Sequence, residues 1–487
     1  MKTVLHYTGI AIIIILSFLG YSSNFYPLLS SDDAIQVLMI HDFKLPHDFY
    51  FWGQDRYGSL IPLLGQIFYR GLGLSPLTSE SIVHYLLLIA GYFAFASFFK
   101  SKLCRLILAV AWFFPPFHLI DFLRGNIGLE YSLLATGIFL INKLNENAFR
   151  ENRLRLHLLL LFITILFILA TWVSDLAAIS IFLILMLQIY FGKFARGSKS
   201  GVLFNWKPAI YYLFSGILIG SALILYGKYH ADKSPLYTGF NDFNTTIDSL
   251  KMFIVSISDL LVFKANETFT SVYFYLVLIL VVTIFVFFTK IQLPENQKKW
   301  FLFFVLDCIL IFGLIMISKW SYTNGVPRRY FASNYITFWM AFLLAFEYLA
   351  ETKIKQVMRI LLLFAVIIAG AGCVYNMKYI WPKTLKPKAK YVREFESLGR
   401  IGIIGNYWNS YINSVTDPEQ IIATPDDRSS VRNREMAYEV MKRDTFYIIR
   451  DGWLEVFPDS LNQFGTPLYK NGEEFRMGDC SVCRYRK

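Results

Sequence analysis

The chain has 487 residues, of which 55% are hydrophobic, 18% aromatic and only 17% charged, with a mean hydropathy of +0.46. A soluble globular protein has about 25% charged residues, so this balance excludes an ordinary soluble enzyme and indicates a protein surrounded mainly by lipid. The net charge of +12 does not indicate a nucleic-acid-binding protein, because the Lys and Arg residues lie mostly in short loops between apolar runs.

Apolar runs along the chain are long enough to cross a membrane. A hydrocarbon core of about 30 Å needs roughly 20 apolar residues in a helix, because a helix satisfies all its backbone hydrogen bonds within one span. The sequence therefore predicts an α-helical integral membrane protein with about eleven transmembrane helices. The predicted spans cover residues 5–21, 81–99, 103–120, 127–142, 156–172, 176–192, 208–227, 271–289, 300–318, 333–350 and 360–379. The first run lacks a convincing small-x-small cleavage site, so we expect a retained span and not a signal peptide.

The basic residues predict the orientation of these spans. With the N-terminus in the cytoplasm, five loops rich in Lys and Arg all fall on the cytoplasmic side, as the positive-inside rule requires. These loops lie near residues 100–105, 143–155, 193–207, 290–299 and 353–359. An odd number of spans puts the C-terminus outside. We therefore expect a transmembrane domain at 1–380, a small soluble extracytoplasmic α/β domain at 381–487, and long outer loops at 22–80 and 228–270.

The first outer loop combines two helical patterns with an acidic pair. Apolar residues recur at helical spacing from Ile35 to Phe43 and from Leu60 to Gly71, which predicts two short amphipathic helices at the membrane surface. Asp32 and Asp33 open the first of these helices. One explanation is structural, because Ser31 can cap the helix and carboxylates suit the positive end of its dipole. The other explanation is that Asp32 or Asp33 acts as a general base on an acceptor hydroxyl.

The same loop contains a second polar group, which consists of His41, Asp42, His47, Asp48, Asp55 and Arg56. Its two His-Asp pairs, six residues apart, could ligate a divalent cation such as Mg, Mn or Ca together with Asp32 or Asp33. Their spacing matches no specific metal motif. The better explanation is therefore a set of polar loop residues in contact with water.

Basic residues are sparse on the predicted outer side, apart from one late segment that contains Lys319, Arg328, Arg329 and Tyr330. These residues could be anchors at the ends of spans, with Tyr330 in the aromatic belt. Alternatively they form a phosphate site, because an Arg side chain binds phosphate oxygens in a bidentate manner. Arg328 and Arg329 are neighbours, so we expect only one of them to point inward.

Glu130, Asp307 and Glu347 fall within predicted spans, where a charge is costly. We expect Asp307, the deepest of them, to form a hydrogen bond within the bundle, because no matching acidic or His residues accompany it as a proton relay. Asp175 lies in a very short outer turn between two spans. We expect Asp175 to face the same cavity as Asp32.

The pattern of the C-terminal region predicts a small α/β domain. Strand-like runs occur at 401–404, 420–423 and 446–449, with a helical stretch at 431–442 between the last two. A C-x-x-C pair, Cys480 and Cys483, follows. One such pair is a weak zinc signal, so a local disulfide in an oxidising compartment is the expected use.

An acidic pair directly after the first span, in a long outer loop with surface helices, resembles the GT-C superfamily of membrane glycosyltransferases. Similar members are protein O-mannosyltransferase-like enzymes, aminoarabinose transferases and bacterial family-39-like proteins. The resemblance is carried by Ser31-Asp32-Asp33-Ala34, by Tyr57 to Leu64 and by Arg328-Arg329-Tyr330-Phe331. The arrangement of loop, bundle and outer domain covers nearly all 487 residues. Many relatives have a basic or His-Pro-Pro-like element where this chain has Tyr57 to Pro62.

The resemblance implies a GT-C-like catalytic domain at 1–380 that transfers a sugar from a polyprenyl-phosphate donor to a lipid, glycan or protein acceptor outside the membrane, usually with inversion. It implies Asp33 or Asp32 as the general base. The donor phosphate would be bound by Arg56, Lys319, Arg328, Arg329 and Tyr330. The acceptor cavity would be lined by Asp55, Asp175 and Tyr57. A bacterial inner membrane suits the resemblance and the short loops, and no nucleic-acid partner is expected.

Two other functions fit parts of the pattern. A polysaccharide polymerase or ligase also acts on lipid-linked sugars, but it is expected to place paired arginines in a long late outer loop. Here the loop at 228–270 has four lysines and no arginine. A lipid or solute transporter would favour internal repeats and broken helices in matched positions, and the two halves of this chain show no convincing repeat.

Overall fold

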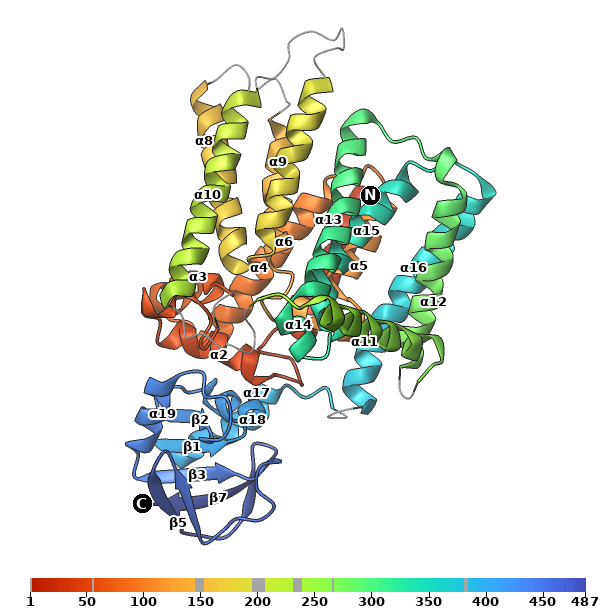
Figure 1. The fold of residues 1–487 in the computed structure, drawn as a ribbon. Coiled ribbons are helices and arrows are strands. Elements are labelled where there is room, and N and C mark those ends of the chain that lie inside the picture. Colours follow the sequence, from red (N-terminus) through yellow and green to blue (C-terminus); the bar gives the residue numbers. More distant parts are fainter. Residues whose placement is uncertain are drawn as a thin grey trace. The chain divides into compact units, whose positions relative to one another are not determined.

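The computed structural model describes residues 2–54, 57–144, 153–194, 206–230, 239–264, 267–380 and 384–487. The contacts divide the chain into two compact units. The helical bundle consists of Met1–Ser17, Leu86–Tyr229 and Ser234–Ile380. The loop-sheet unit consists of Phe18–Tyr85, His230–Lys233 and Trp381–Lys487. Figure 1 shows the helices of the first unit and the C-terminal sheet of the second.

All eleven apolar runs predicted as spans are helical. The helices are α1 (Lys2–Tyr21), α4 (Pro76–Ala96), α5 (Lys102–Phe113), α6 (Glu130–Lys143), α8 (Arg153–Val173), α9 (Ala177–Phe194), α10 (Trp206–His230), α12 (Thr268–Val286), α13 (Glu295–Ile317), α15 (Ala332–Glu347) and α16 (Lys353–Tyr375). Helix α13 packs on α15, α12 on α16, and α6 on α8. A glycine permits one of these close approaches, because a Cβ at Gly137 of α6 would lie 2.3 Å from the ring of Phe167 on α8.

Fewer of these helices are full-length spans than the sequence predicted. Within the described ranges, seven helices are long and apolar enough to cross a membrane, and an eighth span results if α5 and the short helix η2 (Phe117–Leu123) are taken together. That pair is bent by 91°. The bend follows Pro115 and Pro116, which cannot continue the α-helical hydrogen bonding of α5. The chain is a multi-pass membrane protein, and within the described ranges residues Ala177–Phe191 of α9 form a shorter apolar helix.

Contacts join several basic segments at one end of the bundle. The Lys102 ammonium donates to the Thr3 hydroxyl at 2.9 Å, so the start of α5 lies beside the start of α1. Glu347, at the end of α15, accepts the backbone N–H groups of Lys100 at 2.7 Å and of Ser101 at 3.0 Å. The start of α1, the start of α5 and the end of α15 therefore lie together.

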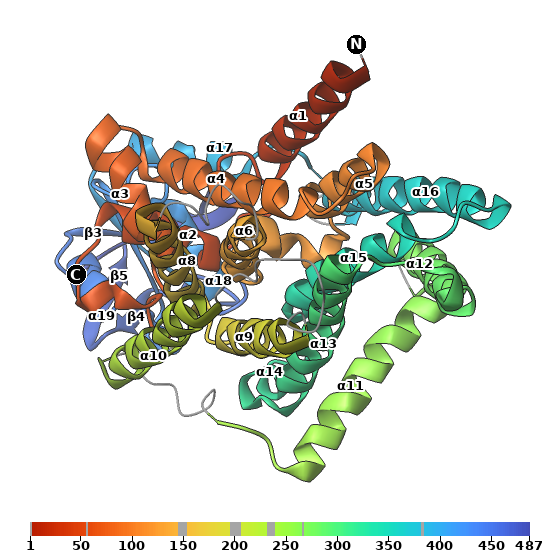
Figure 2. The ribbon, with the colours of Figure 1, turned by 90° about the horizontal axis from the view of Figure 1, so that it is seen from above.

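The second long outer loop contains a helix that the sequence analysis did not predict. Helix α11 (Phe243–Leu261) begins at Asp242, whose carboxylate accepts the N–H of Thr245 at 2.7 Å. Figures 1 and 2 show α11 lying across the direction of α12 and α13, which it contacts together with α14 (Lys319–Thr323). Phe243 and Ile254 on α11 are exposed, so the helix has an apolar face as well as a polar one.

The first outer loop forms the two predicted helices, but the first is buried and not amphipathic. Residues 33–40 of α2 (Ser31–His41) are all buried, and its N-cap is Ser30 and not Ser31 as predicted. A short helix η1 (His47–Phe49) follows. Helix α3 (Leu60–Leu72) is amphipathic, since Leu60 and Ile61 are buried while Ile67 and Leu72 are exposed.

The C-terminal residues form one seven-stranded sheet with the order β2-β1-β3-β7-β5-β4, and β6 pairs with β7. The three predicted strands are present as β1 (Ile401–Gly405), β2 (Ile421–Pro425) and β3 (Thr445–Ile449), and they are parallel. The predicted helix is α19 (Arg434–Met441). The antiparallel strands are β4 (Ser460–Gln463), β5 (Thr466–Lys470), β6 (Phe475–Met477) and β7 (Cys480–Arg486), which the sequence analysis did not predict. The short helices are α17 (Lys388–Val392), η7 (Arg393–Leu398), α18 (Tyr407–Ser410) and η8 (Tyr411–Ser414).

The predicted disulfide between Cys480 and Cys483 is wrong, because both cysteines are free. They lie three positions apart on strand β7, and side chains at such positions point to opposite faces of a sheet. Cys480 accordingly belongs to the core beside Phe395, and Cys483 belongs to the core beside Val440.

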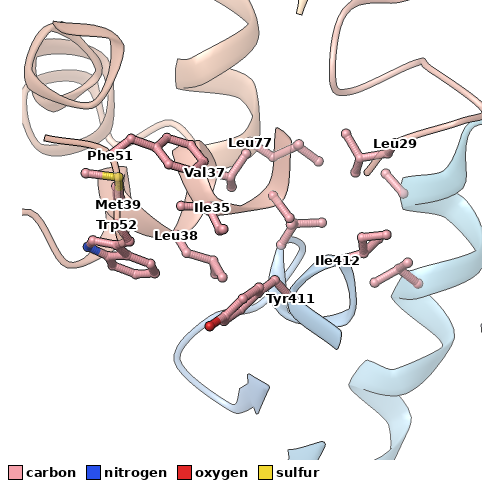
Figure 3. Close-up of a cluster of buried hydrophobic side chains, with 14 residues drawn as sticks. Leu29, Ile35, Val37, Leu38, Met39, Phe51, Trp52, Leu77, Tyr411 and Ile412 are labelled. Carbon is pink, nitrogen blue, oxygen red and sulfur yellow. The ribbon is translucent and has the colours of Figure 1, made fainter. Parts of the chain in front are cut away.

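The first outer loop and the C-terminal residues share one hydrophobic cluster, shown in Figure 3. Leu38 and Met39 of α2 contribute to it, together with Trp52 from the following loop and Ile412 from η8. Burying one such side chain fully stabilises the fold by about 1.5–3 kcal/mol. The loop-sheet unit is therefore held together by apolar packing between segments from the two ends of the chain.

Candidate functional site

Asp33 is part of the cap of helix α2. Its carboxylate Oδ2 accepts the backbone N–H of Ser30 at 2.8 Å and the Ser30 hydroxyl at 2.9 Å, while the N–H of Asp33 donates to the Ser30 hydroxyl oxygen at 3.4 Å. This reciprocal arrangement is a capping box. The side chain is buried, with 5% of its surface exposed. Asp33 therefore has a structural role in the first turn of α2.

Asp32 is half-buried and is held differently. Its Oδ1 accepts a hydrogen bond from the phenol of Tyr407, and the neighbouring Ser31 hydroxyl donates to the carbonyl of Tyr407. No hydrogen bond to Oδ2 of Asp32 occurs among the residues that the structure describes. One oxygen of this carboxylate is thus oriented by the protein, and the other can accept a proton.

Tyr407 is fixed on its other side by Arg432. The guanidinium carbon of Arg432 lies 5.2 Å from the centre of the Tyr407 ring, and its Nη1 donates to the carbonyl of Gly53 at 3.0 Å. Gly53 has a φ of +65°, and a Cβ there would lie 2.9 Å from Cδ of Arg432, so the turn requires a glycine. Burial, and then the charge of Asp32, raises the pKa of Tyr407, which keeps its hydroxyl protonated.

The candidate metal ligands have separate partners. Asp42 pairs with Lys44 at 2.8 Å, and His47 Nδ1 lies 2.9 Å from Asp48. The ring of His41 lies against that of Tyr69, and burial lowers the pKa of His41. Within the described ranges, no group of three or more His, Cys, Asp or Glu residues is placed to hold a metal ion.

Asp48, another member of the predicted polar group, is a buried hydrogen-bond acceptor. It accepts the indole N–H of Trp52 at 2.8 Å, and Tyr57 packs against the hydrophobic cluster that contains Trp52. Asp55 and Arg56 lie outside the described residues.

In the helical bundle, Arg328 lies in the short helix η5 (Arg328–Phe331), and each of its three guanidinium nitrogens donates a hydrogen bond. Its Nε donates to the Ser256 hydroxyl at 2.8 Å, its Nη2 to the Ser256 carbonyl at 2.8 Å, and its Nη1 to Glu267 at 2.5 Å. Glu267 also lies 3.3 Å from Nε2 of His118. Arg328 therefore connects η5 to α11, to the start of α12 and, through Glu267, to η2.

Arg329 points to a second group of charges. Its Nη1 lies 3.5 Å from Oδ2 of Asp121, whose Oδ1 accepts from Arg124 at 2.8 Å. The Arg329 side chain is 35% exposed, compared with 18% for Arg328. The sequence analysis missed Asp121, and a signal was present, because this charged residue comes directly after an apolar run that Pro115 and Pro116 interrupt.

Three further candidates occupy different surroundings in the bundle. Lys319 is exposed at the start of α14. Tyr330 is buried, with its ring edge-on to Trp320 at 4.3 Å between centres. Asp175 forms an ion pair with Lys228 at 3.0 Å, in which both side chains are 36% exposed.

The deepest acidic side chains have partners within the bundle. Asp307 accepts a hydrogen bond from the phenol of Tyr131, and Glu130 accepts one from the Ser333 hydroxyl at 2.8 Å. This confirms the prediction that Asp307 hydrogen bonds to a neighbour. Glu347, by contrast, lies at the basic end of the bundle described above.

Comparison with known proteins gives a match in structure and none in sequence. No protein-family model and no curated protein sequence matches the chain. The crystal structure of ArnT from Cupriavidus metallidurans bound to undecaprenyl phosphate aligns with 99% of this chain and 98% of its own, with a TM-score of 0.56 and 9% identity. At this identity the match shows the fold alone. The chain shares the fold of ArnT, in agreement with the fold class that the sequence predicted.

Two archaeal structures are more distant. The apo oligosaccharyltransferase of Archaeoglobus fulgidus aligns with a TM-score of 0.44 and 12% identity, over 91% of this chain and 69% of its own. The Archaeoglobus fulgidus oligosaccharyltransferase AglB, in complex with an inhibitory peptide and a dolichol phosphate, aligns with a TM-score of 0.37 and 13% identity, over 92% and 70%.

Proposed function

We propose that this chain, a multi-pass membrane protein with a GT-C fold, is a glycosyltransferase that moves a sugar from a polyprenyl-phosphate donor to an acceptor hydroxyl. The observation that carries the proposal is the fold shared over 99% of the chain with ArnT, which was crystallised bound to undecaprenyl phosphate. The acceptor class is a lipid, a glycan or a protein. The transfer takes place on the outer face of a bacterial inner membrane, with the N-terminus in the cytoplasm and the C-terminal residues in the periplasm.

Asp32 is the general base in this proposal. Its Oδ2 takes the proton of the acceptor hydroxyl while the acceptor oxygen forms a bond to the anomeric carbon of the sugar. The bond from that carbon to the phosphate oxygen breaks, and the polyprenyl phosphate leaves with the electron pair. A single displacement of this kind inverts the anomeric configuration. Asp32 is preferred to Asp33 because the Asp33 carboxylate is buried in the capping box of α2.

Cationic side chains assist the departure of the phosphate, which therefore needs no protonating acid. Arg329 is the first choice, because it is more exposed than Arg328 and its contact with Asp121 is 3.5 Å long. Lys319 is exposed and can supply a second positive charge. Arg328 is already hydrogen-bonded to Ser256 and Glu267. Its proposed contribution is therefore to stabilise the backbone of η5, the helix that also contains Arg329. Arg56 is retained as a further phosphate ligand on the resemblance alone.

The decisive test compares two neighbouring substitutions in the full-length protein. Asp32→Asn should reduce turnover by about 10²–10⁴-fold, the usual range for loss of a general base. It should retain binding of the donor, because the amide still accepts the hydrogen bond from Tyr407. Asp33→Asn is the matched control and should keep turnover within roughly threefold, because its role is in the cap.

Transfer would be measured with radiolabelled polyprenyl-phosphate sugars, and donor binding by a filter or scintillation proximity assay. Wild-type turnover in Asp32→Asn would refute the assignment of the base. A severe loss in Asp33→Asn with normal thermal stability would instead make Asp33 the base. Loss of donor binding in both variants would mean that the acidic pair serves the donor and not the acceptor.

A further inference from the structure

Two hydrogen bonds join the first turn of α2 to the C-terminal segment, and each segment donates one of them. The Ser31 hydroxyl donates to the carbonyl of Tyr407, and the Tyr407 hydroxyl donates to Oδ1 of Asp32. These partners are 376 and 375 residues apart in sequence. The main-chain carbonyl and the side-chain hydroxyl of Tyr407 thus form hydrogen bonds with Ser31 and Asp32, the first two residues of the helix.

The sheet explains why Tyr407 is fixed in place. Strand β1 lies between the parallel strands β2 and β3, and Tyr407 comes two residues after the end of β1. The intervening Asn406 caps α18 by accepting the N–H of Asn409 at 3.0 Å, and its side-chain amide donates to the carbonyl and to the carboxylate of Asp451, after β3. The carboxyl edge of parallel strands, at the point where the strand order reverses, is where sheets of this kind present their functional residues.

The ring of Tyr407 is also braced. Arg432 lies over the ring and reaches the carbonyl of Gly53, while the backbone N–H of Arg432 donates to the Tyr411 hydroxyl at 3.0 Å. Tyr411 therefore supports the same segment as Tyr407 but bonds to the backbone and not to Asp32. The two tyrosines form a natural pair for comparison.

We propose that Tyr407 is a positioning residue that orients the Asp32 carboxylate, so that the C-terminal sheet completes the site of acceptor activation. The effect of this role on sugar transfer rests on the proposed function, whereas the orientation of Asp32 does not. The Tyr407 phenol donates its hydrogen bond to Oδ1 of Asp32. This bond fixes Oδ1, which leaves Oδ2 aimed at one direction for an incoming hydroxyl.

The charged and titratable groups around Asp32 are few in the part of the chain that the structure describes. Asp33 lies on the same helix, Tyr407 on α18, and Arg432 beyond the Tyr407 ring, ahead of α19. Tyr411 on η8 faces Arg432 instead. Among these groups, Tyr407 makes the direct hydrogen bond to Asp32, so its removal should dominate any change in the orientation of that carboxylate.

The test measures the reactivity of the Asp32 carboxyl group in full-length protein in detergent, separately from transfer activity. A carbodiimide with a small amine modifies carboxyl groups, and tandem mass spectrometry separates labelling at Asp32 from labelling at Asp33. In Tyr407→Phe, the rate of labelling at Asp32 at one fixed pH should rise by roughly tenfold, because the Asp32 carboxyl group loses the hydrogen bond that holds it, and a hydrogen bond to a charged group typically changes an equilibrium by tenfold or more. In Tyr411→Phe, the labelling rate should equal that of the wild type.

The same variants are assayed for transfer with the radiolabelled polyprenyl-phosphate sugar that the wild type uses. Tyr407→Phe should lower kcat by roughly tenfold and leave the donor KM unchanged, whereas Tyr411→Phe should leave both kcat and KM unchanged. If Tyr407→Phe does not fold, Ser31→Ala removes the other hydrogen bond to Tyr407 and should raise the labelling rate at Asp32 by a smaller amount.

A wild-type labelling rate at Asp32 in Tyr407→Phe, or an equal rise in Tyr411→Phe, overturns the positioning role even if transfer by the wild type is normal. Absence of transfer by the wild type overturns the proposed function, while the labelling result still decides the role of Tyr407. The two failures are therefore distinguishable.

Discussion

The acidic start of α2 and the arginines of η5 are the two charged regions proposed to act in transfer, and they are held in opposite ways. The Asp32 carboxylate is held by a neutral phenol, so its negative charge is not cancelled by its partner. Arg328 and Arg329 are held by the carboxylates of Glu267 and Asp121, which compensate their charge. A carboxylate that is hydrogen-bonded to a neutral donor keeps its charge and can accept a proton. An arginine that is paired with a carboxylate must share or exchange that partner to bind phosphate.

The largest expected effect is on stability, in the arginine region. Arg328→Ala should lower the free energy of unfolding by about 3 kcal/mol, because it leaves the partly buried Glu267 without its ion pair and removes two bonds to Ser256. Thermal unfolding in detergent measures this. Lys228→Ala, which breaks the half-exposed pair with Asp175, is the control and should cost about 0–1 kcal/mol. Equal losses of unfolding free energy in both variants would show that the contacts of Arg328 stabilise the protein no more than a surface ion pair does.

The next effect separates the two arginines. Arg329→Ala should raise the donor KM about tenfold, because a phosphate contact is worth roughly 1.4 kcal/mol, while stability should fall by less than about 1 kcal/mol. Arg329→Lys keeps the charge but loses the bidentate geometry, and it should recover only part of the affinity. A donor KM that is unchanged in Arg329→Ala, measured with the labelled donor, would remove Arg329 from the phosphate site.

The smallest effect concerns the acidic region. Asp33→Ala removes the capping box at the start of α2 and should cost about 0.5–2 kcal/mol, because the N–H of Ser30 loses its partner. Asp42→Ala is the control at the exposed end of the same helix and should change stability by less than about 0.5 kcal/mol. Hydrogen exchange of the first turn of α2 reports the loss locally. Equal protection in the two variants would contradict the capping role of Asp33.

Local features of the fold could be predicted from the sequence. All eleven apolar runs are helical, and three strands and a helix of the C-terminal domain occur where their periodicity placed them. These features depend on residues close together in the chain. The predicted span at 103–120 is interrupted by a bend of 91°, because Pro115 and Pro116 end α5, and α11 was missed because its polar face weakens the signal of its apolar face.

Most of the candidate site could not be predicted, because its partners are distant in sequence. Nothing near Asp32 indicates that Tyr407 will hold it, and nothing near Arg329 indicates Asp121, which is 208 residues away. The acidic pair itself could be found, since it opens a helix directly after a span. The choice between Asp32 and Asp33 required the capping geometry, because the cap is Ser30 and the box therefore includes Asp33.

The account depends most directly on whether the protein transfers sugar from a polyprenyl phosphate. Purified full-length protein would be incubated with radiolabelled polyprenyl-phosphate hexoses and pentoses and with lipid, glycan and protein fractions as acceptors. We expect label to move from one donor to one acceptor class, with release of the free polyprenyl phosphate, and expect Asp32→Asn to abolish both. Release and transfer that are absent from every donor and acceptor combination, or equally fast in Asp32→Asn, would contradict the account.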